Sequence, residues 1–228
     1  MLIVSVDTSG RKGSIALCRG NLESFESLQL ISLEGGTYSA QLMPRIAEAL
    51  KLNNLDKTQV DGFVVVSGPG SFTGLRVGLA TLKGLCEVLR KPLATMSMLE
   101  AIALIFGRPD EITTCSLDAG RGEVYVGEYQ VSAGGIAKVV HEYITKLDAF
   151  AAEAGAANSG HLLTPDSKTA EALRAANINV RLVPTIHADR IGRIGIRKLI
   201  TGEIADPATT DVNYIRRSDA EIFAAPKH

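Results

Sequence analysis

Two short turns carry the side chains best suited to phosphate and magnesium chemistry. Asp7, Thr8 and Ser9 directly follow one strand-like run, and Asp118 and Gly120 follow a second. A carboxylate, hydroxyl groups and backbone N–H groups at the end of a strand can hold a magnesium-bound phosphate. The same residue types also form ordinary Asx turns and hairpins. Spacing alone favours the turn interpretation at both places and leaves the phosphate interpretation open.

The glycine-rich segment Ser67–Gly74 follows a predicted buried strand and opens a long helix. It is not a Walker A loop, because no lysine stands at the required position. It is not a dinucleotide-binding fingerprint either, because Thr73 replaces the last glycine and the next strand does not end in an acidic residue. We therefore predict a tight turn in which Ser71 or Thr73 caps the helix.

The histidines and cysteines do not form a metal-binding pattern. No two of the four histidines are three or four residues apart, and none lies near a pair of cysteines. A zinc or iron site would need ligands from distant segments, so we predict no metal and no cofactor. The motif of a hydrolase nucleophile elbow is also absent. Cys18, Cys86 and Cys115 lie in apolar segments, which is typical of buried thiols in a reducing cytoplasm.

The composition limits the classes of partner. The 228 residues include 24 basic and 25 acidic side chains, for a net charge of −1. A protein that grips nucleic acid by itself usually has a basic excess, so autonomous RNA binding is disfavoured. No apolar run is long enough to span a bilayer, and the strand-like Met1–Val6 does not resemble a signal peptide.

The elements that must position these residues follow the order βββαβαβα, with an antiparallel meander at the start. The expected elements of the first half are strands Leu2–Val6, Ser14–Arg19 and one within Leu22–Leu33, helix Ser39–Leu52, strand Phe63–Val66, the long helix up to Arg90, strand Leu93–Thr95 and helix Met98–Phe106.

The second half repeats this order more weakly. Its expected elements are strands Ile112–Leu117 and Glu123–Val131, a short strand after Gly135, helix Leu147–Ala154, strand His161–Leu163, helix Thr169–Ala176, strand Val180–Val183 and helix Ile186–Ile200. We therefore expect an N-terminal lobe of residues 1–106 and a C-terminal lobe of residues 107–228 that includes the tail.

The long helix has two non-polar sides. At about 100° per residue, Leu75, Leu79 and Leu82 form an apolar side, while Ala80 and Gly84 belong to a side of small residues. Its polar arc is narrow for a surface helix. The helix is therefore buried between layers of its own domain or covered by a second protein, and its spacing does not decide between these.

Five phrases, in order along nearly the whole chain, resemble the bacterial TsaB (YeaZ-type) family. They are Leu2–Ser9, Tyr38–Pro44, Ser67–Gly84, Asp118–Tyr125 and Tyr214–Arg216. The resemblance implies an α/β fold of the two-lobed, actin-like ATPase type (ribonuclease H-like), with βββαβαβα repeated and a reduced second lobe. It also implies a role in making threonylcarbamoyladenosine in tRNA.

The resemblance further implies a cytoplasmic, non-catalytic subunit. TsaB-like proteins pair with the catalytic relative TsaD and work with the ATPase TsaE, and we expect a homodimer when the chain is alone and tRNA contact only through the complex. TsaD carries a pair of metal-binding histidines where this chain has Tyr38 and Leu42. Asp7, Thr8, Ser9, Asp118 and Gly120 are then at most a vestigial nucleotide site.

In this family the helices of the first lobe pair with those of TsaD or of a second copy. The resemblance therefore assigns the small-residue side of the long helix to a partner. The expected interface residues are Leu42, Ile46, Arg76, Val77, Ala80, Lys83, Gly84 and Val88. Two alternatives remain: an autonomous ATP- or metal-dependent enzyme of the glycoprotease type, and a homodimeric module that binds its own small ligand.

Overall fold

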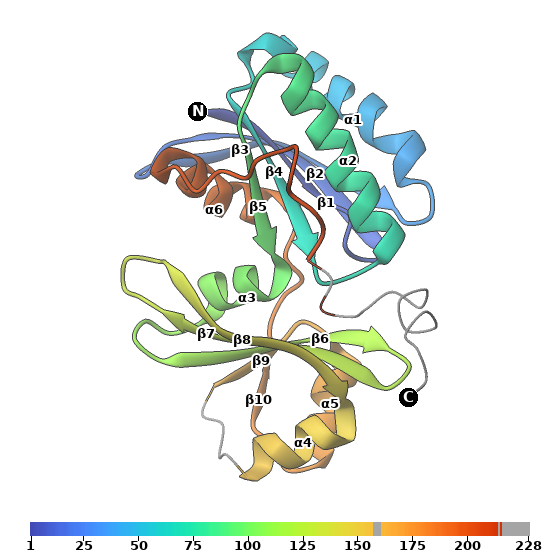
Figure 1. The fold of residues 1–228 in the computed structure, drawn as a ribbon, viewed down its shortest axis with the longest axis vertical. Coiled ribbons are helices and arrows are strands. Elements are labelled where there is room, and N and C mark those ends of the chain that lie inside the picture. The colour runs from blue at the N-terminus through green and yellow to red at the C-terminus, as the bar shows by residue number, and fades with distance from the viewer. Residues whose placement is uncertain (157–160, 214, 216–228) are drawn as a thin grey trace. The chain divides into compact units, whose positions relative to one another are not determined.

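The computed structural model of the chain describes residues 1–156, 161–213 and 215 (Figure 1). Its strands are β1 (Leu2–Asp7), β2 (Lys12–Gly20), β3 (Phe25–Glu34), β4 (Gly62–Gly68), β5 (Leu93–Ser97), β6 (Ile112–Gly120), β7 (Glu123–Val131), β8 (Ala137–Lys146), β9 (Leu162–Thr164) and β10 (Val180–Leu182). Its α-helices are α1 (Tyr38–Leu52), α2 (Phe72–Leu89), α3 (Met98–Phe106), α4 (Leu147–Ala156), α5 (Ser167–Ala175) and α6 (Ala188–Thr201). Both halves follow βββαβαβα, as predicted.

The two sheets share one topology. The first has the strand order β3-β2-β1-β4-β5 and the second β10-β9-β6-β7-β8. In each, three antiparallel strands are extended by two parallel ones. The strand after Gly135, which we expected to be short, is the ten-residue β8. The repeat inferred from the sequence is therefore present at the level of strand pairing.

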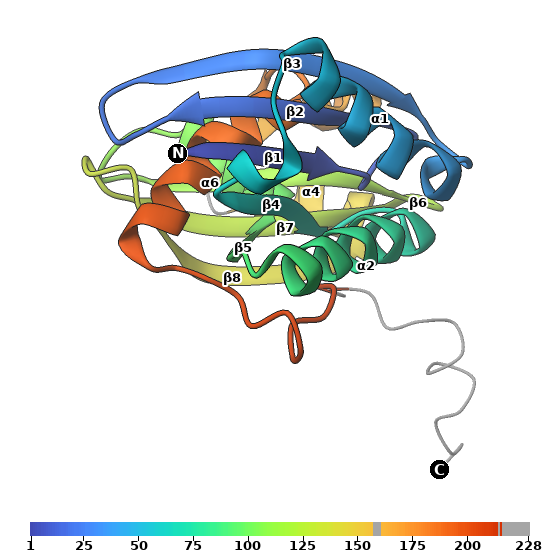
Figure 2. The ribbon, with the colours of Figure 1, turned by 90° about the horizontal axis from the view of Figure 1, so that it is seen from above.

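The first sheet is covered on both faces (Figures 1 and 2). Helices α1 and α2 lie over one face and α6 lies over the other, so every residue of β1 and β4 is buried. Buried strands of this kind read as continuous apolar runs. Helix α6 can approach the sheet closely because Gly192 and Gly195 have no side chain. A side chain at Gly195 would collide with Val64, and one at Gly192 would meet Sγ of Cys18 at 2.8 Å.

The chain divides into two compact units, and the division differs from the one expected at residue 106. The first unit contains Met1–Met98 and Ile186–Asn213, and the second contains Leu99–Thr185. Helix α6, which we placed in the C-terminal lobe, belongs to the first unit, because its buried side packs on β1, β2 and β4.

The second unit has its own core. Val124, Phe150, Leu162 and Leu173 belong to one buried cluster, which joins the second sheet to α4 and α5. Helix α3 packs on β7, where a side chain at Gly127 would meet Cβ of Leu99 at 3.1 Å. This contact explains why α3 groups with the second unit.

The segment after α6 runs along the edge of the first sheet. The N–H of Ala205 donates to the carbonyl oxygen of Leu93 at 2.7 Å, and the N–H of Asn213 donates to that of Ser67 at 2.8 Å. The segment thus pairs with the edge strand β5 at Leu93 and with the end of β4 at Ser67. Of the family-like phrase Tyr214–Arg216, Tyr214 and Arg216 lie outside the described residues.

Candidate functional site

The glycine-rich turn before α2 packs closely against the turn between β1 and β2. The Oγ of Ser71 accepts a hydrogen bond from the N–H of Gly74 at 3.3 Å and so caps the helix, as predicted. The N–H of Ser71 donates to the carbonyl oxygen of Ser9 at 2.7 Å. Gly70 also abuts Ser9, with no room for a side chain and with a φ of +156°. The glycines therefore bring this turn against the β1–β2 turn.

The outward side of α2 consists largely of small and apolar residues. Ala80 and Gly84 are exposed, and Val88 is 78% exposed. A side chain at Gly84 would meet no atom within 4 Å. At the start of the helix, the guanidinium of Arg76 lies 3.9 Å from the centre of the Phe72 ring. The side of α2 that the sequence singled out is therefore open at the surface of the described chain.

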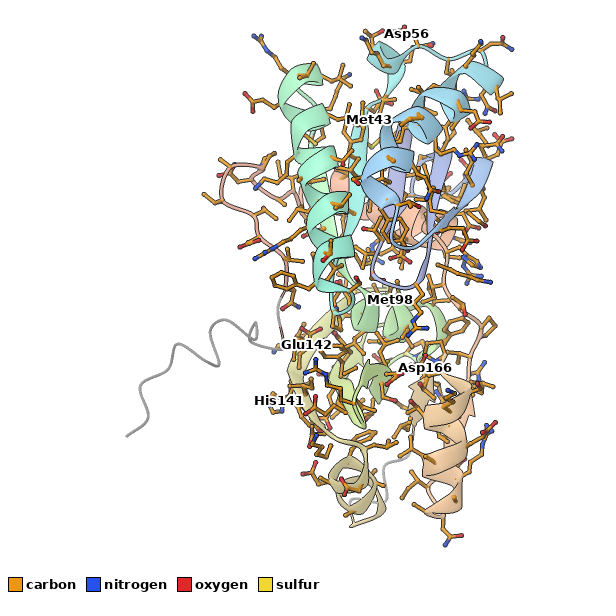
Figure 3. All side chains as sticks on the ribbon, turned by 90° about the vertical axis from the view of Figure 1, so that its right-hand side faces the viewer. Met43, Asp56, Met98, His141, Glu142 and Asp166 are labelled. Carbon is orange, nitrogen blue, oxygen red and sulfur yellow. The ribbon has the colours of Figure 1, made fainter. Side chains whose placement is uncertain are left out.

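Helix α1 runs beside α2 and adds exposed apolar residues (Figures 2 and 3). Met43 is 49% exposed on the side of α1 along which α2 runs, and Ala40 and Ala47 are also exposed. The α1–α2 face is a subset of the exposed residues of both helices, namely Ala40, Met43, Ala47, Arg76, Ala80, Gly84 and Val88. The exposed Thr73 and Glu87 lie on the same side of α2.

Two residues assigned to the interface lie elsewhere. Leu42 is 1% exposed and Ile46 is 5% exposed, because both point from α1 into the core of the first unit. This corrects the prediction for α1, whose outward residues are the neighbours of those chosen. The helical spacing of Leu42, Ile46, Ala49 and Leu50 itself predicts this inner side, so the interface assignment conflicted with the sequence pattern.

Two further residues are only partly available. Val77 is half-buried, and Lys83 is half-buried with its Nζ 2.9 Å from the carbonyl oxygen of Thr210. Lys83 therefore ties α2 to the segment after α6 and is not a free cation at the rim of the face. Arg76 is exposed and retains that position.

The turn after β1 is closed by its own hydrogen bonds. The Oδ1 atom of Asp7 accepts from the N–H of Ser9 at 2.9 Å and from its Oγ at 2.6 Å, which is an Asx turn. Burial raises the pKa of Asp7, and the two bonds from Ser9 offset this only in part. The hydroxyl of Thr8 is buried beneath α2, where it fills the space that a side chain at Gly78 would need.

Tyr38 is held against the same turn. Its hydroxyl donates to the carbonyl oxygen of Gly10 at 2.8 Å, and its ring lies where a side chain at Gly13 would stand. Burial, with a smaller contribution from the Asp7 charge, raises the pKa of Tyr38 to about 12. The hydroxyl is therefore protonated at neutral pH and can donate this hydrogen bond, through which Tyr38 stabilises the turn.

A second Asx-type hydrogen bond lies at the end of β6, where the strand register shifts between Asp118 and Gly120. The N–H of Gly120 donates to Oδ1 of Asp118 at 2.8 Å, and the N–H of Asp118 donates to Oδ2 of Asp166 at 2.6 Å. Burial raises the pKa of Asp166, the hydrogen bond from the Asp118 N–H offsets part of this rise, and the Asp118 charge makes a smaller contribution that raises it. Figure 3 shows Asp166 at the start of α5. In each Asp turn one backbone N–H, that of Ser9 or that of Gly120, is thus directed at the carboxylate of its own turn and is not free for a phosphate.

Among the described residues, no group of three His, Cys, Asp or Glu side chains is arranged to hold a metal ion. Cys18, Cys86 and Cys115 are buried free thiols, as predicted, and burial raises the pKa of each of them. No helix within the described ranges has the length and apolarity to cross a membrane.

Comparison with known proteins identifies the family. The family model described as TsaD, tRNA N6-adenosine threonylcarbamoyltransferase, matches residues 35–181. The chain belongs to the TsaD family. The tRNA threonylcarbamoyladenosine biosynthesis protein TsaB of Bacillus subtilis is 33% identical over 140 residues, which cover 61% of this chain and 60% of that protein. The resemblance to TsaB is thereby confirmed, although the match spans only about three fifths of the relative's length.

Solved structures confirm the fold class. YeaZ from Pseudomonas aeruginosa has a TM-score of 0.72 at 20% identity, over 93% of this chain and 99% of that one. The activator of 2-hydroxyisocaproyl-CoA dehydratase from Clostridium difficile, solved with bound ADPNP, has a TM-score of 0.51 at 11% identity over 90% of this chain and 99% of its own. At these identities the likeness concerns the fold alone, which is of the actin-like ATPase type.

Proposed function

We propose that the chain is a non-catalytic scaffold and activator subunit for threonylcarbamoyladenosine modification of tRNA, and that it pairs with a TsaD-like catalytic subunit. The observation that carries the proposal is the α1–α2 face, whose small and apolar residues are exposed in a member of this family. The name of the B. subtilis relative supports the pathway.

The α1–α2 face suits a helical partner. The axes of packed helices lie about 8–10 Å apart, and small side chains at the contact allow the shorter distances. Ala80 and Gly84 lie one turn apart on the exposed side of α2. Burial of Met43 and Val88, which are 49% and 78% exposed, would stabilise the pair at about 25 cal/mol per Å² of apolar surface. Arg76 would lie at the rim, where an ion pair contributes little.

The two Asp turns and Tyr38 support a scaffold role. Asp7 and Asp118 already accept hydrogen bonds from their own turns, and the Tyr38 hydroxyl is bound to Gly10. The hydrogen bonds of these residues fix the turns of their own units. In the proposed complex, the partner carries out the transfer chemistry. We further propose that the chain forms a homodimer through the same face when the partner is absent, and that a TsaE-like ATPase joins the complex.

The test is co-purification with the TsaD-like subunit of the same organism, followed by a tRNA-modification assay with and without this chain. We expect a stable pair, modification that depends on the chain, and a homodimer that the TsaD-like subunit disrupts. A chain that neither pairs nor stimulates modification contradicts the proposal. ATP turnover by the chain alone with a bound divalent metal would favour the autonomous enzyme.

A further inference from the structure

Helix α6 carries a row of arginines on the side that faces away from its sheet. Arg190 and Arg193 are exposed and Arg197 is half-buried. At about 100° per residue, these three residues fall within about 60° of one another around the helix. The opposite side, which includes Ile191 and Gly195, is buried against the first sheet.

Helix stability does not explain this row. Like charges spaced three and four residues apart destabilise a helix, and Arg190 is the third residue of α6, where the helix dipole disfavours a positive charge. The one acidic residue of α6, Asp189, lies on the flank near Cys18 of β2. Within the described residues, no ion pair involves Arg190 or Arg193.

The row also concentrates charge in a chain that is otherwise balanced. Helix α6 has four basic residues and one acidic residue, whereas the whole chain has a net charge of −1. Lys198, the fourth basic residue, lies 3.8 Å from the carboxylate of Glu203. The row itself is made of arginine, whose planar guanidinium binds phosphate through two parallel hydrogen bonds.

The spacing of the row suits a nucleic-acid strand. Arg197 lies seven positions after Arg190, which corresponds to about 10 Å along the helix axis. In double-stranded DNA the phosphates of one strand follow one another at about 3.4 Å along the duplex axis, and we take this value as a guide to the spacing in RNA. The long arginine side chains can therefore contact several neighbouring phosphates without reading their bases.

We propose that the arginine row of α6 (Arg190, Arg193 and Arg197) contacts the phosphate backbone of tRNA when the chain is part of the tRNA-modifying complex. This inference rests on the proposed function and deepens it by naming a substrate contact. Two or three phosphate contacts are too few for tight binding by the chain alone. Within a complex, the same contacts act at high effective concentration and add to those of the partner.

The test measures the affinity of a labelled tRNA transcript for the complex with the TsaD-like subunit over a series of salt concentrations. We expect the double variant Arg190→Gln/Arg193→Gln to reduce the slope of log affinity against log salt by about 2, or about 1 for each lost contact. A slope change of about 2 amounts to about two log units between ~1 M and ~0.1 M salt, so affinity should fall about 100-fold at ~0.1 M salt, equally for tRNAs of different sequence. The variant Arg190→Lys/Arg193→Lys should retain most of the slope.

The matched control is Arg108→Gln/Arg181→Gln, which removes the same charge from two exposed positions of the second unit. The control should bind tRNA like the wild type. An unchanged slope in the α6 variant, or an equal loss in the control, overturns the inference. Loss of pairing with the TsaD-like subunit in the α6 variant, with unchanged RNA binding by the chain alone, would show that the row serves an acidic protein surface and also overturns it.

A second arm keeps this test separate from the proposed function. The chain alone is titrated with the same tRNA at ~20 mM salt, where electrostatic contacts are strongest. Weak binding that the α6 variant loses supports the inference even if no TsaD-like subunit pairs with the chain. Equal binding by wild type and variant overturns it, and so does the absence of binding by either together with an unchanged salt slope of the complex.

Discussion

Helices α2 and α5 hold equivalent places in the two sheets, since each follows the parallel strand next to the central one. Helix α2 has 18 residues and α5 has nine. Both helices expose charges of both signs and small residues: Lys168, Glu171 and Ala172 on α5, and Arg76, Glu87 and Ala80 on α2. The longer α2 adds the exposed Gly84 and Val88, so the difference between the two surfaces lies in the extent of the small and apolar residues.

The largest expected effect comes from placing a long charged side chain on each helix. Ala80→Arg should weaken pairing with the TsaD-like subunit about 1,000-fold or more, equivalent to about 4 kcal/mol, because the arginine would hold the two helices apart. Ala172→Arg on the exposed side of α5 is the matched control and should pair normally. Calorimetric titration measures both, and equal affinities for the two variants would remove the distinction between the helices.

The next effect separates the two sides of α1. Leu42→Ala should lower the free energy of unfolding by about 3 kcal/mol, because it leaves a cavity beneath a side chain that is 1% exposed. Met43→Ala should change stability by less than about 1 kcal/mol and should weaken pairing instead. Urea denaturation and gel filtration measure the two quantities. The opposite result would restore Leu42 to the interface.

A smaller effect distinguishes two glycines of α2. Gly84→Ala should stabilise the monomer by about 1 kcal/mol, because the new methyl group meets no atom within 4 Å and alanine favours a helix. The same change should weaken pairing, since a partner backbone could no longer approach as closely. Gly78→Ala should instead destabilise the monomer by about 1–3 kcal/mol, because its methyl group collides with Thr8. Stabilisation by both changes would contradict the assigned orientation of the helix.

The smallest expected effect concerns the Asp turns of the two units. Burial raises the pKa of Asp7 above the ordinary value of 3.8, so the folded chain binds its proton more strongly than the unfolded chain. The free energy of unfolding should therefore fall as pH rises from about 4 through the raised pKa. Asp7→Asn keeps the Oδ1 acceptor for Ser9 and should make this part of the pH profile flatter.

Urea denaturation between about pH 4 and about pH 8 measures the profile. The Asp118→Asn variant changes the exposed turn of the second unit and serves as the control. If Asp7→Asn leaves the slope as it is in the wild type, the buried carboxyl does not contribute to the pH dependence of stability.

Much of the fold was predictable because its signals are local. Apolar runs, glycine turns and Pro92 delimit the strands and helices within a few residues, and the Asx turns follow from Asp7 and Asp118. The sequence did not predict which unit α6 belongs to, because the apolar side of α6 could pack on a face of either sheet. The helical spacing of Leu42, Ile46, Ala49 and Leu50 predicts the inner side of α1 that the structure buries. The assignment of Leu42 and Ile46 to the interface came with the family resemblance and conflicts with that spacing.

Since α6 completes the first unit from the far end of the chain, the lobe that is synthesised first is the last to be finished. While the ribosome makes residues 99–185, one face of the first sheet lacks the helix that covers it. A nascent chain in this state exposes apolar strands of the kind that chaperones bind. Expression of residues 1–98 alone should therefore yield an aggregation-prone fragment, whereas adding residues 186–213 in trans or through a linker should render it folded.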